Sequence, residues 1–187
     1  MPLAAHDVAA VLRERLPGLP VKKLHKLLYY CQGHHLATFD EPLFADTIEA
    51  WDMGPVVSTL WRAEKHGAPS PARQQLGEAE LNTIGYVLSR YGALTGKDLE
   101  NLTHSEDPWL TADEDRPPGG STTIKHDVIA RYFRTNSSTE GEEGALDRAV
   151  ISQWLQETTS QPAEPGRPLG REELLARFAE IEARLGD

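Results

Sequence analysis

Proline and glycine divide this chain into short segments, and the apolar residues within most segments recur at helical spacing. Pro17-Gly18 ends the first segment, and Gly54-Pro55 stands where a later one begins. Short amphipathic helices can bury their apolar stripes only by packing against one another. The sequence therefore predicts an all-α fold: a mostly helical, orthogonal multi-helix domain with one short extended pair near residues 43–52, followed by a C-terminal helical tail.

Local signals place the expected helices along the chain. Proline is favoured at the first helical position, because its missing N–H has no partner there, so Gly54-Pro55 is expected to open the third helix. Thr95 and Asp98 have the spacing of a capping box, and Thr123 can cap the last helix of the domain. We expect helices near residues 7–16, 22–38, 54–66, 78–91, 95–102 and 123–133, with a further one beginning inside residues 102–110.

The second of these helices carries a clear apolar face, and it also contains a glycine. Gly33 lowers the stability of a helix interior, which indicates either a closely packed neighbour or a bend. The expected face consists of Leu24, Leu27, Leu28 and Cys31.

The charge of the chain limits its partners. The formal net charge is −10, from 19 Lys and Arg against 29 Asp and Glu. Phosphate contacts need clustered basic side chains, so this charge argues against nucleic-acid binding and suits a basic protein partner. We interpret the one basic cluster as a solvated helix face; it comprises Lys22, Lys23, His25 and Lys26.

Cysteine usage and hydropathy indicate the compartment. Cys31 is the only cysteine, which excludes internal disulfides and a multi-cysteine zinc site. No stretch approaches the ~20 apolar residues of a membrane helix, and the N-terminal MPLAAHDVAAVLRERL lacks the form of a secretory signal. We expect a cytoplasmic protein that makes no membrane contact.

The stretch LTHSEDPWL, residues 102–110, has the composition of a helix start. With Ser105 as the cap, Glu106 and Asp107 fill the first turn, where the helix dipole favours acids. Pro108 then needs no N–H partner, and Trp109 falls on the core side. The following residues 111–122 are expected to form a loop.

The same stretch has a second interpretation, in which His104 and Glu106 are an acid/base pair or metal ligands. A metal site would have to recruit distant histidines, and no His-x-x-x-His or His-Glu-x-x-His spacing supports one; the available residues are His34, His35 and His126. We favour the helix start and expect no catalytic residue, no metal and no cofactor.

The stretch TIEAWDMGPVV, residues 47–57, also allows two interpretations. Trp51 and Trp61 can pack in the core beside a loop that leads into a helix. Alternatively, Trp51, Asp52 and the Gly54-Pro55 turn face outward together, as an aromatic residue beside a rigid turn often does in a protein-binding patch.

The C-terminal part differs in composition from the rest of the chain. We expect a domain at residues 1–136, a flexible linker at 137–144 and a helical tail at 145–187. The tail carries a narrow apolar seam that must dock on its own domain, on a second copy in a homodimer, or on a partner. The seam residues are Leu174, Phe178, Ile181 and Leu185.

Three stretches in order resemble the Panacea domain, also called the SocA-like antitoxin domain. They are KLHKLLYYCQGHHLA from about residue 23, PLFADTIEAWDMGPVV from residue 42 and LTHSEDPW from residue 102, and the resemblance runs from about Val21 to Phe133. It implies a mostly helical cytosolic domain, often phage-associated, that neutralises a co-encoded toxin by direct contact, and it does not imply catalysis. The residues that carry it are Lys26, Leu27, Tyr29, Tyr30, Gly33, Trp51, Gly54, Pro55, Val56, His104, Glu106, Pro108 and Trp109.

These observations predict an antitoxin whose partner is a cognate protein toxin. One alternative is a small hydrolase or nucleotide-handling enzyme that uses His104 and Glu106. Another is a DNA-binding autoregulator, although the helix after the corner at residues 91–95 is too acidic to approach phosphate. The expected partner contacts are Trp51, Asp52, Gly54, Pro55, His104, Glu106 and Trp109, together with the four apolar residues of the tail.

Overall fold

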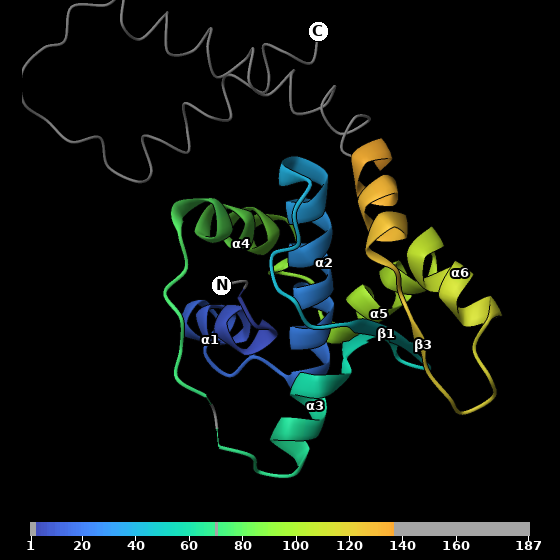
Figure 1. Ribbon diagram of the computed structural model, residues 1–187, viewed down its shortest axis with the longest axis horizontal. Coiled ribbons are helices and arrows are strands. Elements are labelled where there is room, and N and C mark those ends of the chain that lie inside the picture. The colour runs from blue at the N-terminus through green and yellow to red at the C-terminus, as the bar shows by residue number, and fades with distance from the viewer. Residues whose placement is uncertain (1–2, 70, 137–187) are drawn as a thin grey trace, which may run out of the picture. The chain divides into compact units, whose positions relative to one another are not determined.

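The computed structural model describes residues 3–69 and 71–136, which form mostly helices together with one small sheet (Figure 1). The expected linker and tail lie outside the described residues, and so do Leu174, Phe178, Ile181 and Leu185. Within the described ranges, every helix is too short or too polar to cross a bilayer.

Helix α2, Val21–Phe39, lies at the centre of the fold. Every residue from Leu24 to Leu36 is buried, although a surface helix normally keeps a polar face. Its neighbours explain this burial. They are α1 (Ala5–Arg15), α4 (Glu78–Tyr91), α5 (Gly96–His104) and strand β2 (Gly54–Val57), which all pack against α2.

The polar side chains of α2 find partners inside the fold, as buried polar groups must. The Gln32 side-chain amide donates to the carbonyl oxygen of Phe44 at 3.1 Å and accepts from the N–H of Phe44 at 3.2 Å. The His34 ring bonds to the hydroxyl of Tyr91 at 3.1 Å. Burial lowers the pKa of His34 to about 4, so its imidazole is neutral at physiological pH.

The sheet has three short antiparallel strands in the order β2-β1-β3. Strand β1 is Ile48–Trp51. It pairs with β2 so that Ile48 lies opposite Val57 and Trp51 lies opposite Gly54. Strand β3, Thr122–Thr123, pairs with the other edge of β1. The expected extended pair is therefore confirmed in its first strand, but its second strand lies beyond residue 52.

The prediction that Gly54-Pro55 opens a helix is wrong. These residues begin strand β2, and helix α3 is Ser58–Lys65. Val56 and Val57 favour a strand because they are β-branched. Pro55 is tolerated because it pairs across from Ala50 in an edge strand, where no ladder N–H is required of it.

Two expectations near the end of the domain also need correction. Thr123 does not cap a helix but pairs with Glu49 in the sheet, and the last helix is described over residues 126–136. Helix α6, Asp107–Glu114, extends into the expected loop at residues 111–122. The capping box is confirmed: Thr95 Oγ1 accepts from the N–H of Asp98, and the Asp98 carboxylate accepts from the N–H of Thr95.

Gly33 marks a close contact between α2 and the last helix. A Cβ atom at this position would lie 2.3 Å from Cε2 of Phe133, well inside van der Waals contact. The close packing expected from the sequence is therefore confirmed, and the two helices approach at a point where only a hydrogen fits.

We expect Gly33→Ala to lower the free energy of unfolding by roughly 1–3 kcal/mol, because an added methyl group must displace a buried ring. Urea unfolding measures the change. The matched control is Gly85→Ala, which lies in the interior of α4 and would meet only the Nη1 atom of Arg15 at 3.5 Å. That control should be neutral or gain up to about 1 kcal/mol of stability; equal losses in both variants would contradict the packing argument.

Candidate functional site

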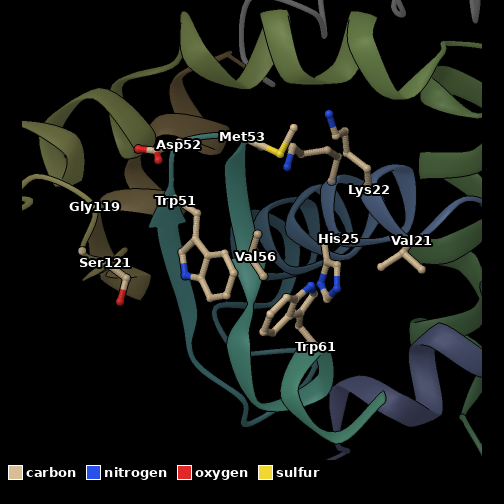
Figure 2. Close-up of a pocket in the computed structure, with 12 residues that line it drawn as sticks. Val21, Lys22, His25, Trp51, Asp52, Met53, Val56, Trp61, Gly119 and Ser121 are labelled. Atoms are coloured by element: carbon tan, nitrogen blue, oxygen red, sulfur yellow. The ribbon is translucent and has the colours of Figure 1, made fainter. Parts of the chain in front are cut away.

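A groove of about 480 Å³ lies between the N-terminal turns of α2 and the β1–β2 hairpin (Figure 2). Its walls come from α2, the hairpin, α3 and the loop before β3. The lining residues are Val21, Lys22, His25, Lys26, Trp51, Asp52, Met53, Val56, Trp61, Gly119, Gly120 and Ser121.

Strand alternation explains the apolar wall of the groove. Successive side chains of a strand point to opposite faces, so Ile48 and Ala50 are buried while Trp51 is only half-buried. Trp51 meets Trp61 of α3 edge to face, with ring centroids 5.0 Å apart. Met53, in the hairpin turn, is 52% exposed. The outer face of the hairpin is thus an accessible apolar surface.

The side chains of His25 and Lys26 form hydrogen bonds with backbone groups of β2. The N–H of Val57 donates to Nδ1 of His25 at 3.3 Å, and the Lys26 ammonium donates to the carbonyl oxygen of Pro55 at 3.2 Å. Both side chains are almost fully buried. The interpretation of this cluster as a solvated face is therefore wrong for these two residues, since the strand edge needs hydrogen-bond partners.

Gly54 brings the hairpin close to α2 and α5. Its φ of +95° lies in a region that side-chain-bearing residues rarely adopt, and a Cβ there would lie 2.7 Å from Cε of Lys26 and 2.9 Å from Oγ1 of Thr103. A glycine is thus required both by the backbone and by its neighbours.

Glu106 lies in the core, between two tyrosines of α2. The hydroxyl of Tyr29 donates to Oε2 and that of Tyr30 donates to Oε1, each at 2.8 Å. Burial raises the pKa of Glu106 to about 7, although the two hydroxyl donors favour the charged form. This carboxyl holds the α5–α6 turn against the central helix.

The expected helix start within residues 102–110 is confirmed, but the cap is not Ser105. Ser105 ends α5, where its hydroxyl donates to the carbonyl oxygen of Leu102, and Glu106 is the N-cap residue of α6. Pro108 is the second helical residue, where its missing N–H is harmless. The tyrosine hydroxyls, which lie far away in sequence, keep Glu106 out of the first turn.

His104 and Glu106 do not form an acid/base pair. Both oxygens of Glu106 accept from tyrosines, and the His104 ring packs on Trp109 with centroids 4.1 Å apart. The indole N–H of Trp109 donates to the carbonyl oxygen of Trp51 at 3.1 Å. The stretch at residues 102–109 therefore holds the end of strand β1 in place.

The histidines considered for a metal site lie apart in the structure. His34 bonds to Tyr91, His35 bonds to Thr83 and His126 contacts Gln32. Over residues 3–69 and 71–136, no three His, Cys, Asp or Glu side chains are grouped so that they could hold a metal ion.

The structure brings some of the expected partner-binding residues to the groove and buries others. Trp51 and Asp52 line the groove, where Asp52 forms an ion pair with Arg116. Gly54, Pro55, Glu106 and Trp109 are buried, and His104 lies beside Trp109. Sequence reasoning missed Val21, His25, Lys26 and Met53 as groove residues.

We expect the buried carboxyl of Glu106 to make the wild type progressively less stable, relative to a Glu106→Gln variant, as the pH rises from about 4.5 to about 7. The folded state keeps a proton up to about pH 7, whereas the unfolded state releases it near 4.5, so deprotonation favours unfolding within this window. Each pH unit is worth about 1.4 kcal/mol, so the relative loss is roughly 3 kcal/mol.

Urea unfolding of both proteins at pH 4.5 and pH 8 measures this difference. The buried histidines titrate in the same window, but they are present in both proteins and cancel in the comparison. Parallel pH profiles for the two proteins would contradict a raised pKa of Glu106.

We expect Gly54→Ala to cost more stability than Gly67→Ala. Both glycines have a positive φ, so both variants carry backbone strain of roughly 1–2 kcal/mol. Only Gly54 also meets buried atoms, whereas a Cβ at Gly67 meets nothing within 4 Å. Thermal unfolding compares the two variants, and equal shifts in Tm would show that the contact with Lys26 and Thr103 carries no cost.

Comparison with known proteins agrees with the resemblance seen in the sequence. Residues 24–110 match the family described as "Antitoxin SocA-like, Panacea domain". This range includes His25 and Lys26 of the α2 wall of the groove, the hairpin and the α5–α6 turn.

A curated relative is similar at a lower level. It is "Nucleoside diphosphate kinase 3" from Spinacia oleracea, 25% identical over 134 residues that cover 59% of this chain and 88% of the relative. This identity is too low to place the chain in the family of that relative, and no solved structure is significantly similar to the chain. The motifs read in the sequence and the family match agree with each other: residues 24–110 of this chain match the SocA-like antitoxin family with its Panacea domain.

Proposed function

We propose that this protein is the antitoxin of a two-protein module and that it neutralises its toxin by direct contact through the groove. The match of residues 24–110 to an antitoxin family supports an antitoxin with a cognate toxin partner. The geometry supports the place of contact, because two of the three family motifs line the groove and the third holds the hairpin from beneath.

The exposed apolar rim of the groove carries this proposal. Val21 and Met53, each about half exposed, flank the half-buried Trp51 and Trp61. Binding energy in protein interfaces concentrates on aromatic residues at the centre of such patches. An accessible apolar surface beside two tryptophans is typical of a site that another protein covers.

The alternative functions have less support in the structure. A hydrolase or nucleotide-handling enzyme would need His104 and Glu106 to act together, but Glu106 is bound to two tyrosines. A likeness at 25% identity to a kinase does not supply another catalytic group. A DNA-binding role conflicts with the net charge of −10.

The first test is co-expression with each reading frame adjacent to the gene, scored by growth rescue and by co-purification. We expect one neighbour to be toxic alone, and to be rescued and bound by this protein. If no neighbour is toxic and none co-purifies, the antitoxin proposal fails.

We expect Met53→Asp to abolish rescue and to weaken co-purification by at least about tenfold, because a carboxylate at the rim must be desolvated in the complex. The matched control is Leu110→Asp on α6, whose side chain is 41% exposed and lies outside the groove. Circular dichroism checks that both variants fold. Loss of rescue in both variants, or in neither, would move the interface away from the groove.

His104→Gln separates contact from catalysis in the same assay. A contact mechanism keeps rescue, whereas an enzyme that uses His104 loses rescue while it still binds its partner.

The tail at residues 145–187 remains a proposed second contact, through Leu174, Phe178, Ile181 and Leu185. Replacing Phe178 and Ile181 with Asp in the full chain tests it. Unchanged rescue and co-purification would remove the tail from the proposed interface.

A further inference from the structure

The α2 wall of the groove holds a hydrogen-bond donor for which the described part of the chain supplies no acceptor. His25 is 2% exposed, and its Nδ1 accepts from the N–H of Val57, so the ring proton of the neutral imidazole lies on Nε2. Among the described residues, Nε2 has no hydrogen-bond partner. A buried N–H without an acceptor is rare in folded proteins and costs stability.

Lys26 adds a second donor on the same turn of α2. Its side chain is 1% exposed, and its ammonium, which can donate three hydrogen bonds, has one acceptor among the described residues, the carbonyl oxygen of Pro55. Glu100 influences it electrostatically, but that carboxylate already accepts from Lys22 and Lys97. Buried charges are normally paired with an opposite charge, but among residues 3–69 and 71–136 this ammonium forms no ion pair.

The opposite wall of the groove is apolar. Trp51, Val56 and Trp61 line this groove together with His25 (Figure 2). A volume of about 480 Å³ lies within the range of roughly 300–1,000 Å³ that ligand-binding clefts occupy. Asp52, at the rim, is already paired with Arg116. The groove therefore offers an apolar wall and, beside it, donors with positive charge.

We propose that this groove binds a partner segment in which a large apolar side chain stands next to an aspartate or glutamate. The apolar side chain packs on Trp51, Val56 and Trp61, and the carboxylate accepts hydrogen bonds from Nε2 of His25 and from the ammonium of Lys26. The identification of this segment as part of a toxin rests on the proposed function. The chemistry of the groove is independent of the proposed function.

A carboxylate fits the two donors better than a neutral carbonyl does. It offers two oxygens with several lone pairs, one for each donor, and it supplies the charge that Lys26 lacks. Hydrogen bonds between charged partners are also shorter and stronger than neutral ones. The overall acidity of the protein still favours a partner with a basic surface at long range, whereas the groove selects for a local acidic group.

Two blocked dipeptides, acetyl-Phe-Glu-amide and acetyl-Phe-Gln-amide, test the proposal with no toxin present. They differ only at the end of one side chain, which is a carboxylate in one peptide and a neutral amide in the other. Each is titrated into the full-length protein while the indole N–H signals of Trp51 and Trp61 and the ring signals of His25 are followed by NMR. We expect the Glu peptide to bind with a Kd of about 1 mM, and about tenfold more tightly than the Gln peptide.

Variants then locate the carboxylate. Lys26→Met keeps the apolar stem of the side chain and should remove the preference for Glu, whereas Lys125→Met, at an exposed lysine outside the groove, should keep it. If Lys26→Met does not fold, Met53→Glu at the rim should lower the affinity for the Glu peptide and leave that for the Gln peptide nearly unchanged.

Equal binding of the two peptides, binding of neither, or signal changes confined to residues outside the groove would overturn the proposal. The peptide result is independent of the antitoxin assay. If the protein prefers the Glu peptide but no neighbouring gene is toxic, the proposed binding site is supported and the proposed function is contradicted. If the protein rescues growth but shows no preference for Glu, the proposed function is supported and the proposed binding site is contradicted.

Discussion

The carboxyl of Glu106, bound by the hydroxyls of Tyr29 and Tyr30, is the contact on which the rest of the structure depends. It fixes the turn between α5 and α6 against the central helix. From that turn, α6 places the indole of Trp109 beneath the hairpin, where it donates to the backbone of Trp51. The position of the groove wall is therefore set by a carboxyl in the core, and the apolar surroundings that raise its pKa also keep water away from these hydrogen bonds.

The helices could be predicted from the sequence wherever their signals are local. The apolar spacing and the breaks at proline and glycine placed α1, α2 and α4 to within about two residues, and the Thr95 capping box was correct. The burial of α2 on all sides could not be predicted in the same way, because its polar side chains bond to residues far away in sequence, as Gln32 does with Phe44. The prediction for residues 54–57 was wrong for a related reason. The signals around Pro55 fit both a helix start and an edge strand, and contacts with α2 and β1 decided between the two.

The candidate site was predictable only on its outer side. Trp51 and Asp52 stand beside a turn, which is a local signal, and both line the groove. His25 and Lys26 belong to a basic stretch, and such stretches usually face water. Their role became visible only when the fold set them against the edge of β2, where each makes one hydrogen bond and retains a further donor. The pairing of a helix side chain with a strand edge has no sequence period, so no pattern could have indicated it.

The close fit of Gly54 against Lys26 and Thr103 ties the three motifs together physically. A change in the hairpin, in α2 or in α5 at this point disturbs the other two, so these positions can change only in concert. Val21 and Met53 stand on the rim of the same groove, exposed and free of any such constraint. A protein built in this way can acquire a new partner through substitutions at a few rim positions while its interior stays the same.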